Sequence, residues 1–97
     1  MTKEQIISQI EQIYFTGSFS ESTIRNDLQL RKSMDIRSGG QTNYLGEKRS
    51  FYIQEIDTVL NLLKKMQTAC SDDSAFVSRC KRCEDQVNKL LDIVRNF

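Results

Sequence analysis

Apolar residues in the second half of the chain follow two heptad patterns, each with alternating steps of four and three residues. The first comprises Tyr52, Ile56, Val59, Leu63, Met66 and Cys70. The second comprises Phe76, Cys80, Cys83, Val87, Leu90, Val94 and Phe97. A chain folded back at Asp73 brings the two series together, with Leu63 facing Cys83 and Val59 facing Val87. The pattern predicts a long antiparallel helical hairpin of residues 50–70 and 73–96.

Two further helices are predicted before the hairpin. Thr2 and Gln5 resemble a capping box, and isoleucines at helical spacing follow, so a helix is expected over 2–15, closed by Gly17 in the left-handed conformation. Ser20 or Ser22 caps a shorter second helix towards residue 37. Its tail also alternates between apolar and polar positions, which leaves residues 28–37 open between helix and strand.

Turn-forming residues concentrate between Arg37 and Arg49, in the run RSGGQTNYLGEKR. The pattern predicts a glycine-containing surface loop or a loose β-hairpin there. Ser50 is then expected to cap the first hairpin helix, and Ser71 or Asp72 the second. The expected fold class is all-α, with residues 1–97 forming a single helical domain.

The positions beside the seam predict how the other helices pack. One flank is apolar and is expected to be covered by the helix over 2–15; it comprises Ile53, Leu60, Val77 and Leu91. The opposite flank is mostly polar but keeps Leu62 and Ile93, which can receive the second helix or another subunit. With Phe19 and Leu30, these two residues are the predicted partner interface, and a homo-oligomer is expected.

Composition agrees with a helical chain of one domain. The 97 residues are 38% hydrophobic and 28% charged, proline is absent, and three of the four glycines lie at 39, 40 and 46. The net charge of +1 gives no global attraction for nucleic acid or membranes. No apolar run approaches the ~18 residues of a membrane span. We expect no membrane contact and a cytoplasmic protein, of a bacterium or of a virus-infected cell.

Cysteine usage adds no separate chemistry. Cys70, Cys80 and Cys83 all fall on the seams, which favours reduced core residues over a Cys70–Cys80 disulfide. The spacing of Cys80 and Cys83 invites a metal interpretation, but structural zinc needs four ligands and the chain has three thiols and no histidine. We expect no metal and no cofactor.

Catalytic signatures are missing from the sequence. The chain contains no nucleophile-elbow, phosphate-loop or zinc-protease motif, and its carboxylates fall beside lysines and arginines at surface positions of the predicted helices. We expect no catalytic residues and a protein that is not an enzyme.

The run SESTIRNDL, from Ser20 to Leu28, is similar to the recognition-helix region of DeoR-family transcriptional repressors. The resemblance implies that Arg25 and Asn26 face DNA and that the following glycine loop forms a basic β-wing. It covers about nine of the 97 residues. It also departs from the family's pattern, because only TGSF separates the first predicted helix from Ser20, where that family has a positioning helix.

A second binding hypothesis concerns the basic, glycine-containing segment 25–49. Backbone amides of glycines with flanking cations hold phosphates in other proteins, and an exposed tyrosine can stack on a base. The candidate contacts for a phosphate, nucleotide or nucleic acid are Arg25, Arg31, Lys32, Arg37, Gly39, Gly40, Tyr44, Lys48 and Arg49.

The sequence therefore predicts a non-catalytic helical-hairpin interaction module: an adaptor, assembly or inhibitor protein, of the kind found among phage and bacterial accessory factors. It is expected to bind a protein partner or itself. The alternative is a nucleic-acid or nucleotide binder that uses segment 25–49.

Overall fold

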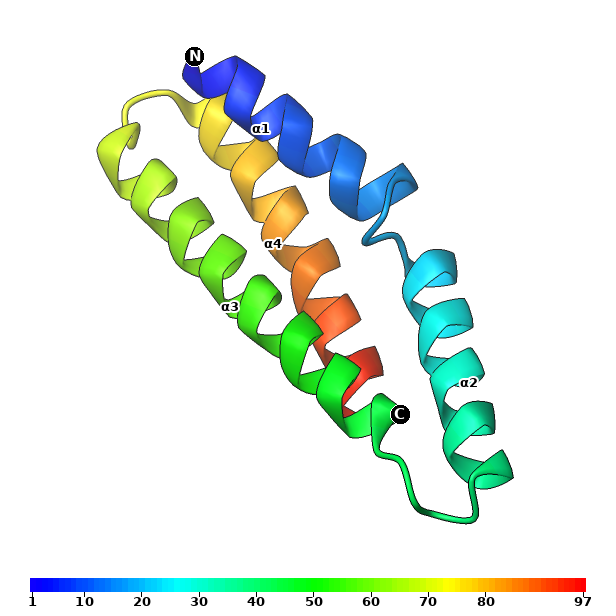
Figure 1. Ribbon diagram of the computed structural model, residues 1–97. Helices are drawn as coiled ribbons and strands as arrows, with labels where there is room; N and C mark the ends of the chain where they lie inside the picture. Colours follow the sequence, from blue (N-terminus) through cyan, green and yellow to red (C-terminus); the bar gives the residue numbers. More distant parts are fainter.

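The computed structural model describes all residues, 1–97, and every regular element is helical (Figure 1). The elements are α1 (Lys3–Glu11), a π-helical turn η1 (Gln12–Thr16), α2 (Glu21–Arg37), α3 (Tyr44–Ala69) and α4 (Ser74–Arg95). Helices α3 and α4 run antiparallel, and α1 and α2 lie end to end along them. The result is a rod of 55 × 22 × 20 Å. It is a helical bundle in which α1 and α2 together occupy the place of one helix.

The predicted helical hairpin is confirmed. Its seam is buried on both sides, with Ile56 and Leu63 of α3 and Cys83 and Val87 of α4 fully inaccessible. At one end the Arg49 side chain donates to the carbonyl oxygens of Val94 (3.0 Å) and Arg95 (2.8 Å). Towards the other end, Gln67 donates to the Glu84 carboxylate. Both contacts lie within a few residues of the predicted antiparallel register.

The predicted loop or β-hairpin at about 37–49 is wrong. Helix α3 begins at Tyr44, so only residues 38–43 connect it to α2, and no strand is present. The carboxylate of Asp35 explains the early start, because it accepts hydrogen bonds from the backbone N–H groups of Tyr44 (2.9 Å) and Leu45 (3.0 Å). These bonds satisfy free amides of the first turn of α3 and tie it to the end of α2.

Several predicted helix ends also move. Asn43, and not Ser50, caps α3 by accepting from the amide of Gly46 (3.2 Å), and Asp73 caps α4 by accepting from that of Phe76 (3.1 Å). The capping box of Thr2 with Gln5 and the Ser20 cap are confirmed.

Residues 28–37, left open between helix and strand, are helical throughout. The alternation that suggested a strand comes from apolar side chains on the surface of α2, since Leu30 and Ile36 are 55% and 69% exposed. Tertiary contacts of the two buried residues, Ile24 and Leu28, hold the segment as a helix.

Gly17 does not take the predicted left-handed conformation, because its φ is −99°. The first helix instead ends in the wide turn η1, where the Phe19 amide donates to the Ile13 carbonyl (3.0 Å). A side-chain carbon at Gly17 would lie 2.8 Å from the carbonyl oxygen of Gln12, so this position needs glycine for close backbone approach.

The N-terminal helix covers a different flank of the hairpin from the one predicted. Glu11 pairs with Arg79 (2.6 Å), Lys3 pairs with Asp73 (2.8 Å), and Gln86 donates to the Tyr14 carbonyl (3.4 Å). Arg79 and Gln86 belong to the mostly polar flank, so the expected cover over Ile53, Leu60, Val77 and Leu91 is wrong. Long polar side chains can lie at the edge of the interface between two helices while apolar side chains occupy its centre.

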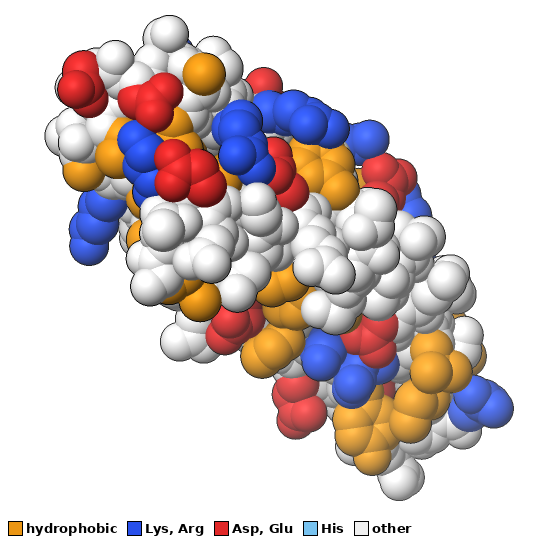
Figure 2. Space-filling model, turned by 90° about the horizontal axis from the view of Figure 1, so that it is seen from above, with side chains coloured by type: hydrophobic (Ala, Val, Ile, Leu, Met, Phe, Trp, Pro, Cys, Tyr) orange, Lys and Arg blue, Asp and Glu red, His pale blue; other side chains and the backbone are white.

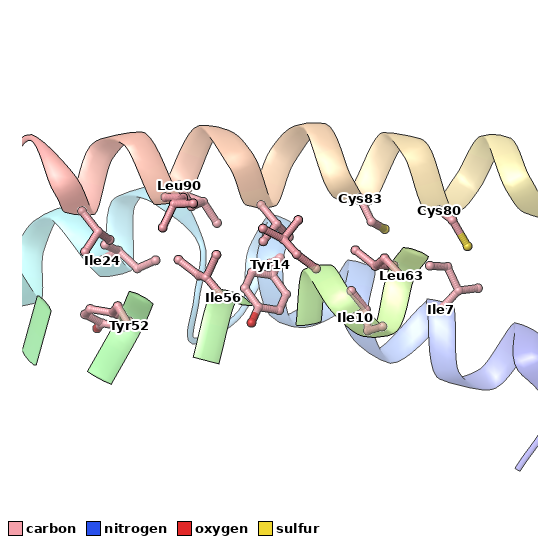
Figure 3. Close-up of a cluster of buried hydrophobic side chains, with 14 of the residues drawn as sticks. Ile7, Ile10, Tyr14, Ile24, Tyr52, Ile56, Leu63, Cys80, Cys83 and Leu90 are labelled. Carbon is pink, nitrogen blue, oxygen red and sulfur yellow. The ribbon is translucent and has the colours of Figure 1, made fainter. Parts of the chain in front are cut away.

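Beneath those polar contacts, Ile7, Ile10 and Tyr14 point inward (Figure 3). They meet the buried side chains of the hairpin, including Leu63 and Cys80, and form one core cluster with them. Each such apolar side chain contributes about 1.5–3 kcal/mol when buried. The core thus extends from the α3–α4 seam under both α1 and α2.

The cysteines give a direct test of this packing. Burial raises the pKa of Cys83 to about 11 and also raises that of Cys80, while Cys70 is half-buried. Because the thiolate is the reactive form, we expect a thiol reagent at pH 7.5 to label Cys70 first and to leave Cys80 and Cys83 unmodified until denaturant is added. Mass spectrometry of the labelled peptides measures this order. Rapid native labelling of Cys83 would contradict the packing.

Candidate protein-interaction surface

An exposed apolar stripe follows one side of α3. It consists of Tyr44, Phe51 and Leu62, whose side chains are 38%, 42% and 39% exposed. Their spacings of seven and eleven residues are close to whole helical turns, so they point in directions within about 20° of one another. Thr58 and Ala69, both exposed, continue the same line. The stripe therefore runs nearly the full length of the helix.

Helix α2 contributes two more apolar side chains to the same side of the molecule. Leu30 and Met34 are 55% and 38% exposed and lie one turn apart. They share a side of α2 with Asp27, whose carboxylate accepts from the Tyr52 hydroxyl of α3 (2.6 Å). Both side chains thus border the groove where α2 meets α3.

The turn η1 adds Ile13, which is 41% exposed. Phe15 leaves the turn towards α4, where Arg82 stacks on its ring at 4.7 Å. Ile13, two residues earlier, emerges on the opposite side, towards α3.

Six of the eight exposed large apolar side chains therefore belong to one surface, the apolar flank. It consists of Ile13, Leu30, Met34, Tyr44, Phe51 and Leu62. Hydrophobic side chains also break the charged surface on the face seen in Figure 2. Exposed apolar side chains gathered on one side of a protein are typical of sites that bind other proteins.

Aromatic rings form the floor of the flank. Phe19 lies edge-on against Tyr14 and Tyr52, with centroids 5.2 and 5.3 Å away, and Phe51 lies 5.7 Å from Tyr52. The ammonium group of Lys48 sits 4.4 Å above the Phe51 ring. Phe19 is half-buried in this cluster. It supports the flank from below, whereas Phe51 presents its ring to solvent.

A polar network joins α2 to α3 beside these rings. Asp27 accepts from Tyr52 and from Arg31 (2.9 Å), and Lys48 lies 4.0 Å away. Burial opposes ionisation of Asp27, but the hydrogen bonds from Tyr52 and Arg31 prevail and lower its pKa. Burial, and then the bond to Asp27, raise the pKa of Tyr52. The network fixes α2 against α3 and so fixes the groove.

The four predicted interface residues do not form one patch. Leu30 and Leu62 lie on the apolar flank, and Phe19 lies below it. Ile93 is half-buried and borders a hollow that Arg25 of α2 and Phe97 also line. Of the two alternatives for Ile93, the second helix is the element beside it in the structure. Sequence reasoning missed Ile13, Met34 and Phe51 as surface residues, and it assigned Tyr44 to phosphate or nucleic-acid contact. The spacing of Tyr44, Phe51 and Leu62 was a usable signal.

The predicted phosphate contacts are mostly engaged within the chain. Arg25 pairs with Glu21 (3.0 Å), Arg31 with Asp27, and Lys32 lies 5.9 Å above the ring of Phe97. Lys48 and Arg49 hold the aromatic rings and the end of α4, as described above. Arg37 is exposed. The cations of the segment therefore take part in separate contacts and do not meet at one site.

The two loop glycines have the backbone conformation of a helix ending. Gly39 and Gly40 have φ values of 68° and 83°, and their amides donate to the carbonyls of Ile36 (3.1 Å) and Asp35 (3.2 Å). They close the last turn of α2, as glycines do in that conformation. Both N–H groups are therefore occupied, which argues against an anion nest at this loop.

The run similar to the DeoR-family recognition helix forms the first turns of α2. Arg25 is paired and Asn26 is exposed. The turn η1 and residues 17–20 lead directly into α2, with no separate positioning helix. The expected β-wing is wrong, because the loop is short and α3 follows it. This run is a capped helix start.

None of the helices combines the length and the hydropathy needed to cross a bilayer. No three or more potential metal ligands from histidine, cysteine, aspartate and glutamate lie together. Comparisons of the chain with models of protein families, with curated proteins and with solved structures find no match.

Proposed function

We propose that this protein is a non-catalytic helical-hairpin interaction module that acts by protein–protein binding and self-association, as an adaptor, assembly or inhibitor protein. The observation that carries the proposal is the apolar flank: six exposed apolar side chains from η1, α2 and α3 on one side of the rod. Amphipathic helices bind such grooves through apolar residues at helical spacing.

The polar residues support the same proposal, because they serve the fold. Asp35, Asn43 and Asp73 satisfy helix N-termini, and Arg49 satisfies the C-terminus of α4. Asp27 and Glu11 bind α2 and α1 to the hairpin. For the setting we propose a cytoplasmic phage or bacterial accessory factor, by analogy with other small helical proteins and not from a site.

Replacing two residues of the flank tests the proposed function. We expect the parent protein to self-associate in sedimentation near 100 μM, and Phe51→Glu/Leu62→Glu to remain monomeric, because charges on the flank cannot be buried against a second protein. Both residues are exposed, so helicity should be unchanged. Lys81→Glu/Asn88→Glu, at exposed positions of α4, is the control and should associate like the parent.

A parent that stays monomeric, or a double variant that associates as well as the parent, would contradict the proposed function. Retention on heparin that falls steeply with salt would instead favour the alternative, a nucleic-acid or nucleotide binder using segment 25–49. The candidate contacts for that alternative are the cations of segment 25–49, of which Arg37 is exposed and forms no ion pair within the chain.

A further inference from the structure

Two charges along the edge of the α3 stripe that faces away from α2 carry information about what lies on the stripe. Glu47 and Lys65 are both exposed and, unlike Glu11, Glu21 or Asp27, neither forms an ion pair within the chain. Both point to the same side of the stripe, the side away from α2, within about 40° of it. One is negative near the start of α3 and the other is positive near its end.

We propose that the occupant of the stripe is α3 of a second copy, packed antiparallel about a two-fold axis near residues 56 and 57. This proposal rests on the proposed function, since it names the partner of the apolar flank. In a two-fold contact every pairing occurs twice with the roles exchanged, so the stripe has to complement its own reverse.

The stripe meets that condition at one register. When position 51 faces position 62 of the second copy, Phe51 packs on Leu62, and the large Tyr44 faces the small Ala69. Glu47 then falls opposite Lys65, offset by a single residue, or about 1.5 Å along the axis. Because a two-fold axis perpendicular to the paired helices keeps each flank on its own side, both Glu47–Lys65 pairs form along the edge away from α2.

The groove geometry fits this arrangement. Helix α2 lies along the first half of α3, held there by Asp27 and Asp35. The second half of the other α3 therefore runs past Leu30 and Met34. Helix α3 is about 39 Å long. A single pair of such stripes gives an interface at the small end of the range for specific complexes, so we expect a weak dimer.

A charge-exchange experiment tests the pairing. Glu47→Lys alone places lysine against lysine, and Lys65→Glu alone places glutamate against glutamate. Each variant should dimerise about 10-fold more weakly than the parent in sedimentation equilibrium at low salt. An equimolar mixture of the two variants should regain the parent's affinity. In the mixed dimer the two introduced side chains face each other with opposite charges, and the native Glu47 of one copy faces the native Lys65 of the other.

Matched controls reverse charges on the other side of α3. Asp57→Lys and Lys64→Glu are exposed and change the net charge by the same amounts. They should dimerise like the parent, and mixing them should change nothing. Circular dichroism of every variant checks that helicity is kept.

The outcomes separate this inference from the proposed function. If Phe51→Glu/Leu62→Glu abolishes association while the charge variants behave like the parent, the flank binds but this pairing is wrong. If the mixture stays as weak as the single variants, the antiparallel register is likewise wrong. A monomeric parent overturns both proposals.

Discussion

Replacing Val87 by aspartate is expected to unfold the protein. Val87 is fully buried in the α3–α4 seam, and the surrounding residues are apolar. A buried carboxylate without a partner costs several kcal/mol, against a total stability of about 5–15 kcal/mol for a small domain. Loss of the helical circular dichroism signal, or a melting temperature lowered by more than about 15 °C, measures the effect.

Leu63→Ala tests the same seam more gently. Its side chain is fully buried, so truncation leaves a cavity and should cost about 2–5 kcal/mol in urea denaturation. Two exposed neighbours are the controls: Asn88→Asp beside Val87 and Leu62→Ala beside Leu63. Each should change stability by less than about 1 kcal/mol. If a seam variant has the same melting temperature as its control, the hairpin packing is wrong.

Asp27→Ala is expected to weaken the packing of α2 against α3. The substitution removes the acceptor for the Tyr52 hydroxyl and for Arg31, and it leaves both donors in a half-buried place between α2 and α3. The cost should be about 2–3 kcal/mol in chemical denaturation. Glu21→Ala removes two surface ion pairs at the start of the same helix, one with Arg25 and one with Lys89 of α4. It is the control and should cost at most about 1 kcal/mol.

The same carboxylate predicts an acid limit of stability. Because the folded pKa of Asp27 lies below its unfolded value, its contribution is present above about pH 4 and is lost as the pH falls through the folded pKa. Asp35 and Asp73 shift in the same direction, through hydrogen bonds from Thr42 and Lys3 respectively. Urea midpoints measured from pH 6 to pH 2 should fall, and less steeply for Asp27→Ala.

The hairpin was predictable because its seam is buried and periodic. The seam residues of each helix, such as Leu63 in α3 and Val87 in α4, recur at helical spacing, because each of them has to face the partner helix to be buried. The start of α3 was not predictable. Tyr44 and Leu45 follow a run of turn formers. They are helical because their N–H groups donate to Asp35, which lies in α2 on the other side of the loop, where a local sequence pattern does not show the contact.

The cover of the hairpin was mispredicted because polar side chains were taken as solvent-facing. The polar ends of Arg79 and Gln86 contact Glu11 and the Tyr14 carbonyl at the edge of the N-terminal helix, while the apolar residues beside them are buried. The opposite charges of Glu11 and Arg79 were a signal, but sequence alone does not say which carboxylate meets which cation. Half of the predicted interface, Leu30 and Leu62, falls on the apolar flank. Phe51 was overlooked because it stands one position before the seam residue Tyr52.

The break between α1 and α2 divides the helical layer on the hairpin into two parts that are held to the hairpin by different contacts. The N-terminal helix has only nine residues before η1, too few to hold a helix in isolation. It is kept by Ile7, Ile10 and Tyr14 and by two partly exposed ion pairs. Helix α2 is tied separately to α3 through Asp27 and Asp35. The break at residues 17–20 therefore lets α1 undock without unwinding α2, at a free energy set mainly by the burial of Ile7, Ile10 and Tyr14.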